Sequence, residues 1–405
     1  MPFQLSPAEE ISRKIAQEYT EREIIPRRRE LMTDDRAMWR EQPDKQTRFG
    51  FHRHIIPRKE GGTGIGFVAS CVAIEELCAG WPDLQFVTYG EMAYYFVKAT
   101  GGEVEKKFLP GIISGDIRAT VTTTEPSGGS DIVNFQTTAR KVEGGWVLNG
   151  RKCFASEAEC CQFVMTLVKT GDPNDPATRG NRSLTAFIVE MDRPGFKMGR
   201  LENTLGRNQD LAELIFDNCF VPDANLVGQV GRGVPPVFQA VADTGRMTIC
   251  GMLNGITLGA YRCAVKYAKE RKAYGKSISE LQAIQHRIAD MTIDLEATRA
   301  LTYRAAWQRT QGRSCAGEMA VAKYFATQAA LRTCLHSVNV HGAYGVLDDY
   351  MPHHFYKHAP LRITAGGTDE IMKNMIAAAA LADGNPDMSS KPMEEAYFGG
   401  WAASA

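Results

Sequence analysis

"TTARKVEGGWVLNGRKCFAS", Thr137 to Ser156, is the stretch in which the sequence changes from helical to extended patterning. Two extended runs flank Gly144 and Gly145, a glycine pair typical of a hairpin turn. Further short runs of the same kind follow in "CQFVMTLVKT", "SLTAFIVEMD" and "AELIFDNCFVP". Short strands separated by turn signals predict a compact antiparallel barrel or sandwich over about residues 118–232.

Helical patterning lies on both sides of this β-region. "SPAEEISRKIAQEYTEREIIP" has a serine cap, early glutamates and apolar residues at helical spacing, which predicts an N-terminal helical domain over residues 1–117. Three long apolar-periodic stretches and a short final helix after Gly367 predict a four-helix bundle over residues 233–383, followed by a tail over 384–405. The expected fold is therefore α+β and multi-domain: helices, a middle antiparallel β-barrel, then a helical bundle.

The composition excludes several classes of protein. The chain has 405 residues, of which 44% are hydrophobic, enough for a substantial core. Its 47 basic and 47 acidic residues balance, which argues against a nucleic-acid partner. No apolar run approaches the length of a membrane helix, so no membrane partner is expected. The ten cysteines form no CxxC pair, which favours reduced thiols in a cytoplasmic protein with no bound metal.

"VTTTEPSGGSD", Val121 to Asp131, is the stretch most specific for chemistry. It leaves a strand and enters a turn set by Pro126, Gly128 and Gly129. Such a turn points backbone N–H groups and hydroxyls at a ligand, and it suits a phosphate or the edge of a heterocycle. An ordinary β-turn without a ligand is the alternative interpretation.

Four stretches resemble the acyl-CoA dehydrogenase flavoprotein family in their order and spacing: "TTTEPSGGSD", "WVLNGRKCFAS", "YAKERKAYGKSISELQAIQHRIADM" and "VHGAYGVLDDYMPHHFYKHAPLRITAGGTDEI". The resemblance covers about residues 8–382. It implies the same three-part fold, FAD as cofactor and an acyl-CoA thioester as substrate, with hydride exchange between the α,β C–C bond and the flavin. It also implies a homotetramer built as a dimer of dimers, and an electron-transferring flavoprotein as the usual electron acceptor.

The resemblance also implies individual cofactor contacts. Thr124 and Ser130 correspond to the flavin-edge loop, and Ser130 also lies near the phosphates of CoA or FAD in the family. Phe154 and Ser156 correspond to residues that pack on, and hydrogen-bond to, the flavin ring. Arg271 corresponds to an arginine that pairs with the FAD pyrophosphate of the partner subunit. The remaining implied cofactor contacts are Tyr274, Gln282, Gly342, Gly345, Thr368 and Glu370.

The catalytic base is where this sequence departs from the family. The family removes the α-proton of the thioester with a glutamate at one of two places, which here hold Gly245 and Gly366. A displaced base is one explanation, and Asp243 and Glu91 are the candidates. The resemblance also places Asp243 at CoA, together with Arg246, so Asp243 has a rival role there. For Glu91 the alternative is an ordinary solvated residue. For Arg246 the alternative to CoA binding is a structural ion pair.

Two further explanations stay open. The chain could catalyse a related flavin reaction that needs no such base, such as enoyl-CoA reduction or elimination of a substituent. Alternatively, it could be the FAD-binding subunit of a heteromeric dehydrogenase whose related partner carries the base. A helical scaffold without flavin would require all four motifs to be relics.

Overall fold

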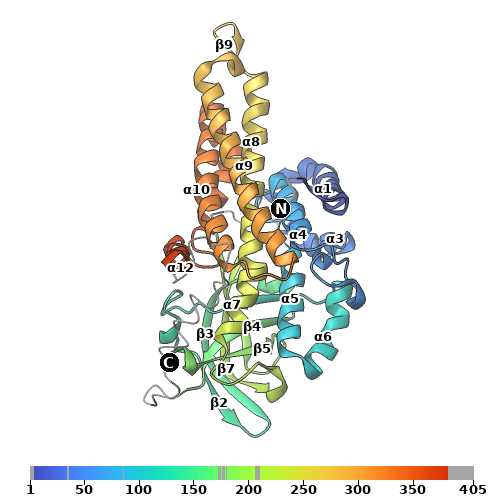
Figure 1. Cartoon of the computed structure of the whole chain (residues 1–405), viewed down its shortest axis with the longest axis vertical. Coiled ribbons are helices and arrows are strands. Elements are labelled where there is room, and N and C mark those ends of the chain that lie inside the picture. The colour runs from blue at the N-terminus through green and yellow to red at the C-terminus, as the bar shows by residue number, and fades with distance from the viewer. Residues whose placement is uncertain are drawn as a thin grey trace. The chain divides into compact units, whose positions relative to one another are not determined.

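The computed structural model describes residues 4–33, 36–84, 86–171, 175, 178, 180–205 and 210–381. These residues form two compact units (Figure 1). The bundle unit comprises the described parts of Met1–Met38, Gly64–Gln85 and Gly245–Ala405, and the sheet unit comprises Trp39–Thr63 and Phe86–Thr244. The predicted succession of helices, β-structure and helices is confirmed.

The sheet unit is built on one eight-stranded sheet with the order β6-β7-β3-β2-β4-β5-β8, in which β1 also pairs with β4. Its strands are β1 (Ala119–Thr122), β2 (Thr138–Val142), β3 (Gly145–Ser156), β4 (Phe163–Lys169), β5 (Leu184–Glu190), β6 (Phe196–Asn203), β7 (Asp210–Pro222) and β8 (Leu226–Val227). Its helices include α3 (Ala37–Arg48), α5 (Val87–Thr100), α6 (Gly102–Ser114) and α7 (Val234–Ala240).

The sheet is mixed rather than wholly antiparallel. β1 pairs with β4 in parallel as far as Thr122 opposite Thr166, and β2 joins β4 in parallel at Thr138 opposite Lys169. The remaining ladders of the sheet are antiparallel. Extended strands alternate with period 2 in either direction, so the sequence pattern alone does not distinguish the two pairings. The consequence is a loop, residues 123–137, that leaves the side of β4 opposite Thr166 and returns to it opposite Lys169, three residues further along the strand.

The core of the sheet unit lies on both faces of β4. Phe163 and Leu167 face a cluster that includes Phe96 of α5, whereas Val164 and Val168 face the opposite cluster. A strand buried on both faces reads as a continuous apolar run, as "FVMTLV" does. This rigid centre supports the loops at the strand ends.

The bundle unit is helical. Its helices are α1 (Pro7–Tyr19), α2 (Arg28–Leu31), α4 (Phe67–Gly80), α8 (Met247–Glu270), α9 (Gln282–Thr310), α10 (Ala316–His341), α11 (Pro352–His358) and α12 (Asp369–Leu381). Figure 1 shows α8, α9 and α10 side by side, with a short hairpin of β9 (Lys272–Ala273) and β10 (Lys276–Ser277) at one end. On α8, a Cβ at Gly255 would lie 2.5 Å from the carbonyl oxygen of Glu75, so this glycine lets α4 pack closely.

The N-terminal helices contribute to both units. α1 and α4 belong to the bundle unit, whereas α5 and α6 belong to the sheet unit. The helical stretch that begins at α7 is interrupted by a π-helical segment, Val241–Arg246, before α8 starts. The predicted domain boundaries at 117, 232 and 383 stay predictions, and the tail over 384–405 lies outside the described residues.

Candidate functional site

The loop of residues 123–137 supports the first group of predicted contacts. Glu125 and Gly128 exchange two backbone hydrogen bonds, each 3.0 Å long, which close a tight turn. Thr124 is half-buried and Ser130 is exposed. The loop therefore places the predicted contact Thr124 before the turn and the predicted contact Ser130 after it.

Strand β3 has a bulge beside this loop. Its ladder with β7 shifts register between Lys152 and Ala155, so Cys153 and Phe154 stand opposite a single residue of β7. Phe154 has a φ of 61° and its side chain is 55% exposed, while Ser156 is half-buried. Bulges re-aim side chains, and a bulky residue in the left-handed region is strained. An exposed and strained aromatic ring is a mark of a ligand site.

Two threonines of β1 hold this bulge in place. Thr122 Oγ1 donates to the carbonyl of Cys153 at 2.8 Å, and Thr120 Oγ1 donates to the carbonyl of Ser156 at 3.0 Å. These carbonyls lie on either side of Phe154 in the chain. The backbone that carries the exposed ring is therefore fixed by hydrogen bonds from a neighbouring strand.

A buried ion pair joins the loop to β3. Lys152 is fully buried, and its Nζ lies 2.7 Å from Glu125 Oε1. Sequence reasoning did not single out this pair. The available signals were a lysine at an inward position of a strand and an acid inside a glycine-rich turn.

The two candidate bases are buried in the sheet unit. Asp243 lies in the π-helical segment, is 2% exposed, and accepts a hydrogen bond of 2.7 Å from Gln239 Nε2. Glu91 on α5 is also 2% exposed, so its interpretation as a solvated residue is wrong. Gly245 is buried in the same π-helical segment as Asp243. Single π-turns inside helices are rare and occur often at functional sites.

Arg246 and the loop of residues 363–368 form a second group in the bundle unit. Arg246 is 2% exposed, and its Nε donates to the carbonyl of Gly366 at 2.8 Å. Gly366 and Gly367 have φ values of 66° and 105°. A Cβ at Gly366 would lie 2.8 Å from Ile249 Cδ1. The loop therefore favours glycine at position 366 for its backbone conformation, and a side chain there would also displace the Ile249 methyl.

A second fully buried lysine, Lys323 of α10, fastens this loop. Its Nζ donates to the carbonyls of Ile363 at 2.8 Å and Gly367 at 3.0 Å, and lies 2.9 Å from Asp369 Oδ1. Thr368 Oγ1 accepts from the N–H of Ile371 at 3.3 Å, which caps α12. The lysine and this cap fix the loop and the start of α12. Thr368 is half-buried and Glu370 is exposed.

The remaining predicted contacts lie at the opposite end of the bundle. Arg271 follows α8, and its guanidinium lies 5.9 Å from the ring centre of Tyr344 beyond α10. Tyr274, in the hairpin, has a φ of 51° and is 92% exposed. Along α10, Lys323 and Gly342 are separated by about 28 Å, from the rise per residue of an α-helix. The structure thus brings Arg271 near the end of α10 that carries Gly342, and not near Thr368.

The other two residues of this end fit the same placement. Gln282 is exposed at the first position of α9, and Gly342 ends α10 with a φ of 60°. Gly345 is buried, and a Cβ there would lie 2.5 Å from the carbonyl oxygen of Val338. The two glycines are therefore required by the turn that ends α10.

One cluster of metal-type ligands occurs in the part of the chain that the structure describes. Asp348, His353 and His354 each offer one ligand atom, and these atoms lie within 4.8 Å of one another. His353 Nε2 is hydrogen-bonded to Asp348 Oδ1 at 3.1 Å, and His354 Nε2 to the Asp348 carbonyl at 3.1 Å. Both histidine rings are therefore hydrogen-bonded to Asp348, and the three residues form a hydrogen-bond network at the start of α11.

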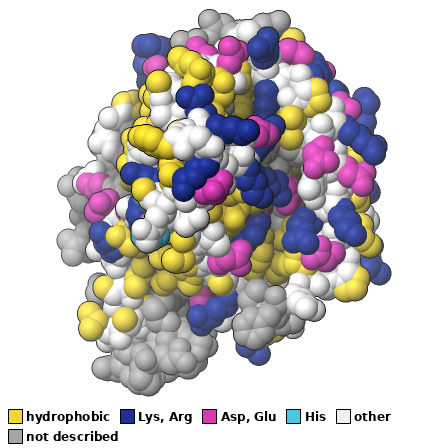
Figure 2. All heavy atoms as spheres, turned by 90° about the horizontal axis from the view of Figure 1, so that it is seen from above, with side chains coloured by type: hydrophobic (Ala, Val, Ile, Leu, Met, Phe, Trp, Pro, Cys, Tyr) yellow, Lys and Arg dark blue, Asp and Glu magenta, His cyan; other side chains and the backbone are white. Residues whose placement is uncertain are grey.

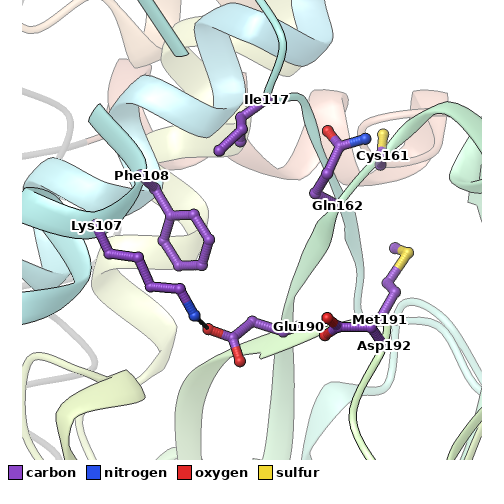
Figure 3. Close-up of a pocket in the computed structure, with 8 residues that line it drawn as sticks. All are labelled: Lys107, Phe108, Ile117, Cys161, Gln162, Glu190, Met191 and Asp192. Carbon is purple, nitrogen blue, oxygen red and sulfur yellow. Dashed lines mark hydrogen bonds and ion pairs between the residues drawn. The ribbon is translucent and has the colours of Figure 1, made fainter. Parts of the chain in front are cut away.

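A hollow of about 430 Å³ on the sheet unit contains none of the predicted site residues (Figure 3). Lys107 and Phe108 line it from α6, and Lys107 Nζ lies 2.5 Å from Glu190 Oε1 across the opening. Figure 3 shows that this pair closes on itself rather than pointing into the hollow. We do not assign the hollow to the site.

Comparison with known proteins agrees with this arrangement. Three family models match in succession: acyl-CoA dehydrogenase, N-terminal domain over residues 6–116, middle domain over 120–219 and C-terminal domain over 231–381. An acyl-CoA dehydrogenase of Bacillus subtilis (strain 168) is 32% identical over 369 residues, which are 90% of this chain and 96% of that protein. The chain belongs to the acyl-CoA dehydrogenase family.

Further relatives bear on the reaction and the cofactor. The subunit CarC of the caffeyl-CoA reductase-Etf complex of Acetobacterium woodii is 30% identical, over 91% of this chain and 97% of that protein. Butyryl-CoA dehydrogenase from Megasphaera elsdenii superposes with a TM-score of 0.88 at 26% identity, covering 94% and 100% of the two chains. The FAD complex of PigA has a TM-score of 0.83 at 25% identity, covering 93% and 98%.

These findings confirm the predicted fold class and the enzyme class of oxidoreductases that act on CH–CH groups, and FAD is the cofactor of the family.

Among the described residues, no helix combines the length and the apolar character needed to span a bilayer. Figure 2 shows basic and acidic side chains interspersed with hydrophobic ones on one face, without a field of a single sign.

Proposed function

We propose that this chain is an FAD-dependent acyl-CoA oxidoreductase that acts on the α,β C–C bond of a thioester. The observation that carries the proposal is Phe154, an exposed aromatic ring on a strained bulge whose backbone is held by Thr120 and Thr122. A strained exposed ring is retained where it packs on a ligand, and a flat heterocycle suits it. Membership of the family supports FAD as that ligand.

The residues of the sheet unit would hold the flavin as follows. Phe154 would pack against the ring, with the hydroxyls of Thr124, Ser130 and Ser156 as hydrogen-bond partners for its polar edge. FAD, when bound, supplies the hydride acceptor for the β-carbon. In the bundle unit, Thr368 lies on a loop fixed by Lys323, and Glu370 lies in the first turn of α12, whose first residue Asp369 pairs with the same lysine. This supports their role as further cofactor contacts.

The contacts at the far end of the bundle would serve a second copy of the chain. Gly342 lies about 28 Å along α10 from Lys323, and Arg271 lies near that end of the helix, beside Tyr344. We therefore propose that Arg271, with Tyr274, Gln282, Gly342 and Gly345, meets the cofactor of a neighbouring subunit. Exposed apolar side chains at this end, those of Tyr344, Val346 and Leu347, support burial against another copy. A homotetramer built as a dimer of dimers is the proposed assembly.

Asp243 is the proposed base of the reaction. It is buried, lies in a π-turn, and precedes by two residues the glycine that stands at a base position of the family. Its carboxylate would take the α-proton of the thioester, with Ser130 and Arg246 toward the CoA moiety. Glu91 is the second candidate, because it is buried in the same unit. None of the ten cysteines, all of them in the described part of the chain, forms a disulfide, which supports a cytoplasmic location.

Anaerobic titration of the FAD-loaded chain with a panel of saturated acyl-CoAs tests this function. Bleaching of the oxidised flavin band by at least one thioester is the expected result. A protein that binds FAD but is bleached by none of them, alone or mixed with a related subunit, would reject dehydrogenation. Bleaching only on mixing would instead support the FAD-binding subunit of a heteromer.

Enoyl-CoA reduction is the second candidate reaction, and the similarity to CarC, a subunit of a caffeyl-CoA reductase-Etf complex, favours it. That similarity also supports an electron-transferring flavoprotein as partner. The test is to reduce the flavin chemically and then to add unsaturated acyl-CoAs without oxygen. Reoxidation faster than reduction by the matching saturated thioester would assign the reductive direction. Release of a substituent without net flavin reduction would indicate the elimination-type reaction.

A further inference from the structure

One buried charge pair touches both segments of the sheet unit that carry predicted flavin contacts. Lys152 lies on β3, two residues before Phe154, and Glu125 follows Thr124 in the loop. Lys152 Nζ lies 2.7 Å from Glu125 Oε1 and donates to the carbonyl of Thr123 at 2.9 Å. The lysine therefore binds the loop on both sides of Thr124.

Glu125 gathers the far end of the same loop. Its carboxylate accepts hydrogen bonds from the backbone N–H groups of Gln136 and of Thr137, the latter at 3.0 Å. The ring of Phe135, fully buried, lies with its centre 4.1 Å from Lys152 Nζ. The first and last residues of the loop 123–137 are thus joined through the Glu125 carboxylate. The Lys152 side chain is enclosed between these two ends of the loop.

The backbone of the bulge is tied to the same point. The N–H of Cys153 donates to the carbonyl of Thr124 at 2.9 Å. Lys152 and Cys153 are thus consecutive residues of β3 that both contact the loop around Thr124. A shift of the loop would break the ion pair and this hydrogen bond together, so the separation between Thr124 and Phe154 is set here.

We propose that Glu125 and Lys152 are positioning residues for the cofactor: their buried pair holds the hydroxyl of Thr124 in register with the ring of Phe154. This inference rests on the proposed binding of FAD by these two segments. Neither residue needs to touch the flavin, because the pair acts through the loop and the bulge. Loss of the lysine leaves a buried carboxylate without its counter-ion, and the loop that wraps around it then has to rearrange.

The pair also predicts a pH dependence. Burial lowers the pKa of Lys152 to about 8, even though Glu125 opposes the shift. Burial alone would raise the pKa of Glu125, but the charge of Lys152 and the hydrogen bond from Gln136 keep it below its usual value. The other titratable neighbour is Cys153, whose pKa is raised, chiefly by burial, so the thiol stays neutral near pH 8. Glu213 of β7, which also acts on Cys153, is paired with Arg151.

Below pH 8 Lys152 is charged and the pair is complete in the free protein. Above pH 8 the lysine loses its proton in the held loop, whereas in a rearranged loop that releases it to water its pKa would return to about 10.4, so the held geometry is favoured as the pH rises. FAD affinity is therefore expected to be constant below pH 8 and to rise by up to ~tenfold per pH unit above it.

The experiment is a titration of the apo full-length chain with FAD between pH 6.5 and 9.5, followed by flavin fluorescence. Wild type is expected to show the rise in affinity above pH 8. Lys152→Met is expected to bind FAD at least ~tenfold more weakly at pH 7 and to lack the pH step. Lys141→Met, which removes a half-exposed partner of Asp223 on the same sheet, is the control and should match wild type at every pH.

Lys152→Met with the affinity and the pH step of wild type would overturn the inference. If Lys152→Met does not fold, Glu125→Gln decides the matter. This variant removes the charge that supports the lysine proton, so the pH step should move below 8, and an unmoved step would overturn the inference. Wild type that binds no FAD at any pH would instead reject the proposed function.

Discussion

The loops at 123–137 and 363–368 are both anchored by a fully buried lysine, but with opposite polarity. In the sheet unit the acid, Glu125, belongs to the loop and accepts hydrogen bonds from backbone N–H groups, and its partner Lys152 lies on the strand β3. In the bundle unit the loop offers carbonyls, and Lys323 collects them from α10.

The polarity of the anchoring group determines which backbone conformation each loop has to adopt. A loop that turns its N–H groups inward can be held by one carboxylate within an ordinary backbone. The loop at 363–368 turns the carbonyls of Ile363, Gly366 and Gly367 toward two cations, Lys323 and Arg246. Its backbone enters the left-handed region at both glycines to do so. A glutamate at position 366 would therefore conflict with the way this loop is fastened.

Removal of Lys323 is the change expected to have the largest effect. Lys323→Met leaves Asp369 buried without its cation and two carbonyls without a donor, which should lower the free energy of unfolding by about 3–5 kcal/mol. Urea denaturation followed by tryptophan fluorescence measures the change. A loss below about 1 kcal/mol would show that the loop does not depend on the lysine.

Substitution of Gly366 tests why this loop carries glycine. Gly366→Ala should cost about 1–2 kcal/mol, because the left-handed backbone disfavours a side chain and Ile249 Cδ1 has to shift to make room for it. Gly144→Ala is the matched control: its φ of 71° is similar, but an added Cβ meets nothing within 4 Å, so about 1 kcal/mol is expected. Equal losses in the two variants would remove the steric part of the explanation.

The same geometry predicts the behaviour of an added base. Gly366→Glu should be destabilised and inactive in flavin reduction, whereas Gly245→Glu, whose φ does not lie in the left-handed region, should fold. Flavin reduction by Gly366→Glu at a rate above wild type would contradict this account of the loop.

Substitution of Phe154 should have a smaller effect, because it should raise the stability of the protein but weaken the binding of FAD. Phe154→Gly relieves a φ of 61° and is expected to raise the stability by up to about 1 kcal/mol. The same change removes the ring proposed to pack on the flavin, so FAD affinity should fall by about tenfold, from the strength of aromatic stacking. Thermal unfolding of the apo chain and FAD titration measure the two effects. A loss of stability with unchanged affinity would make Phe154 a structural residue only.

Much of the fold could be predicted from the sequence because the pattern changes period at two places. The strands of the sheet unit and the long helices of the bundle follow directly from alternating and 3.6-residue spacing. The parallel pairing of β1 with β4 could not be predicted in this way, since strand direction leaves no mark on the alternation.

The site was predicted less completely, for reasons of local physics. The bulge at Phe154 depends on the register of β7, which no property of β3 alone reveals. Lys152 and Lys323 were missed because lysine is almost never fully buried unless it is paired, and their partners are distant in sequence. Glu91 was expected as a possible solvated residue for the same reason, yet it is buried.

Exchange of the thioester α-hydrogen with solvent deuterium tests the central claim most directly, that this chain supplies its own base at Asp243. The FAD-loaded enzyme is incubated in D₂O with an acyl-CoA that reduces the flavin, and label at the α-carbon is followed by mass spectrometry. Wild type and Glu91→Gln are expected to exchange the α-hydrogen. Asp243→Asn is expected to do so ~10²–10⁴-fold more slowly while it retains FAD. Exchange by Asp243→Asn at the rate of wild type would contradict the claim.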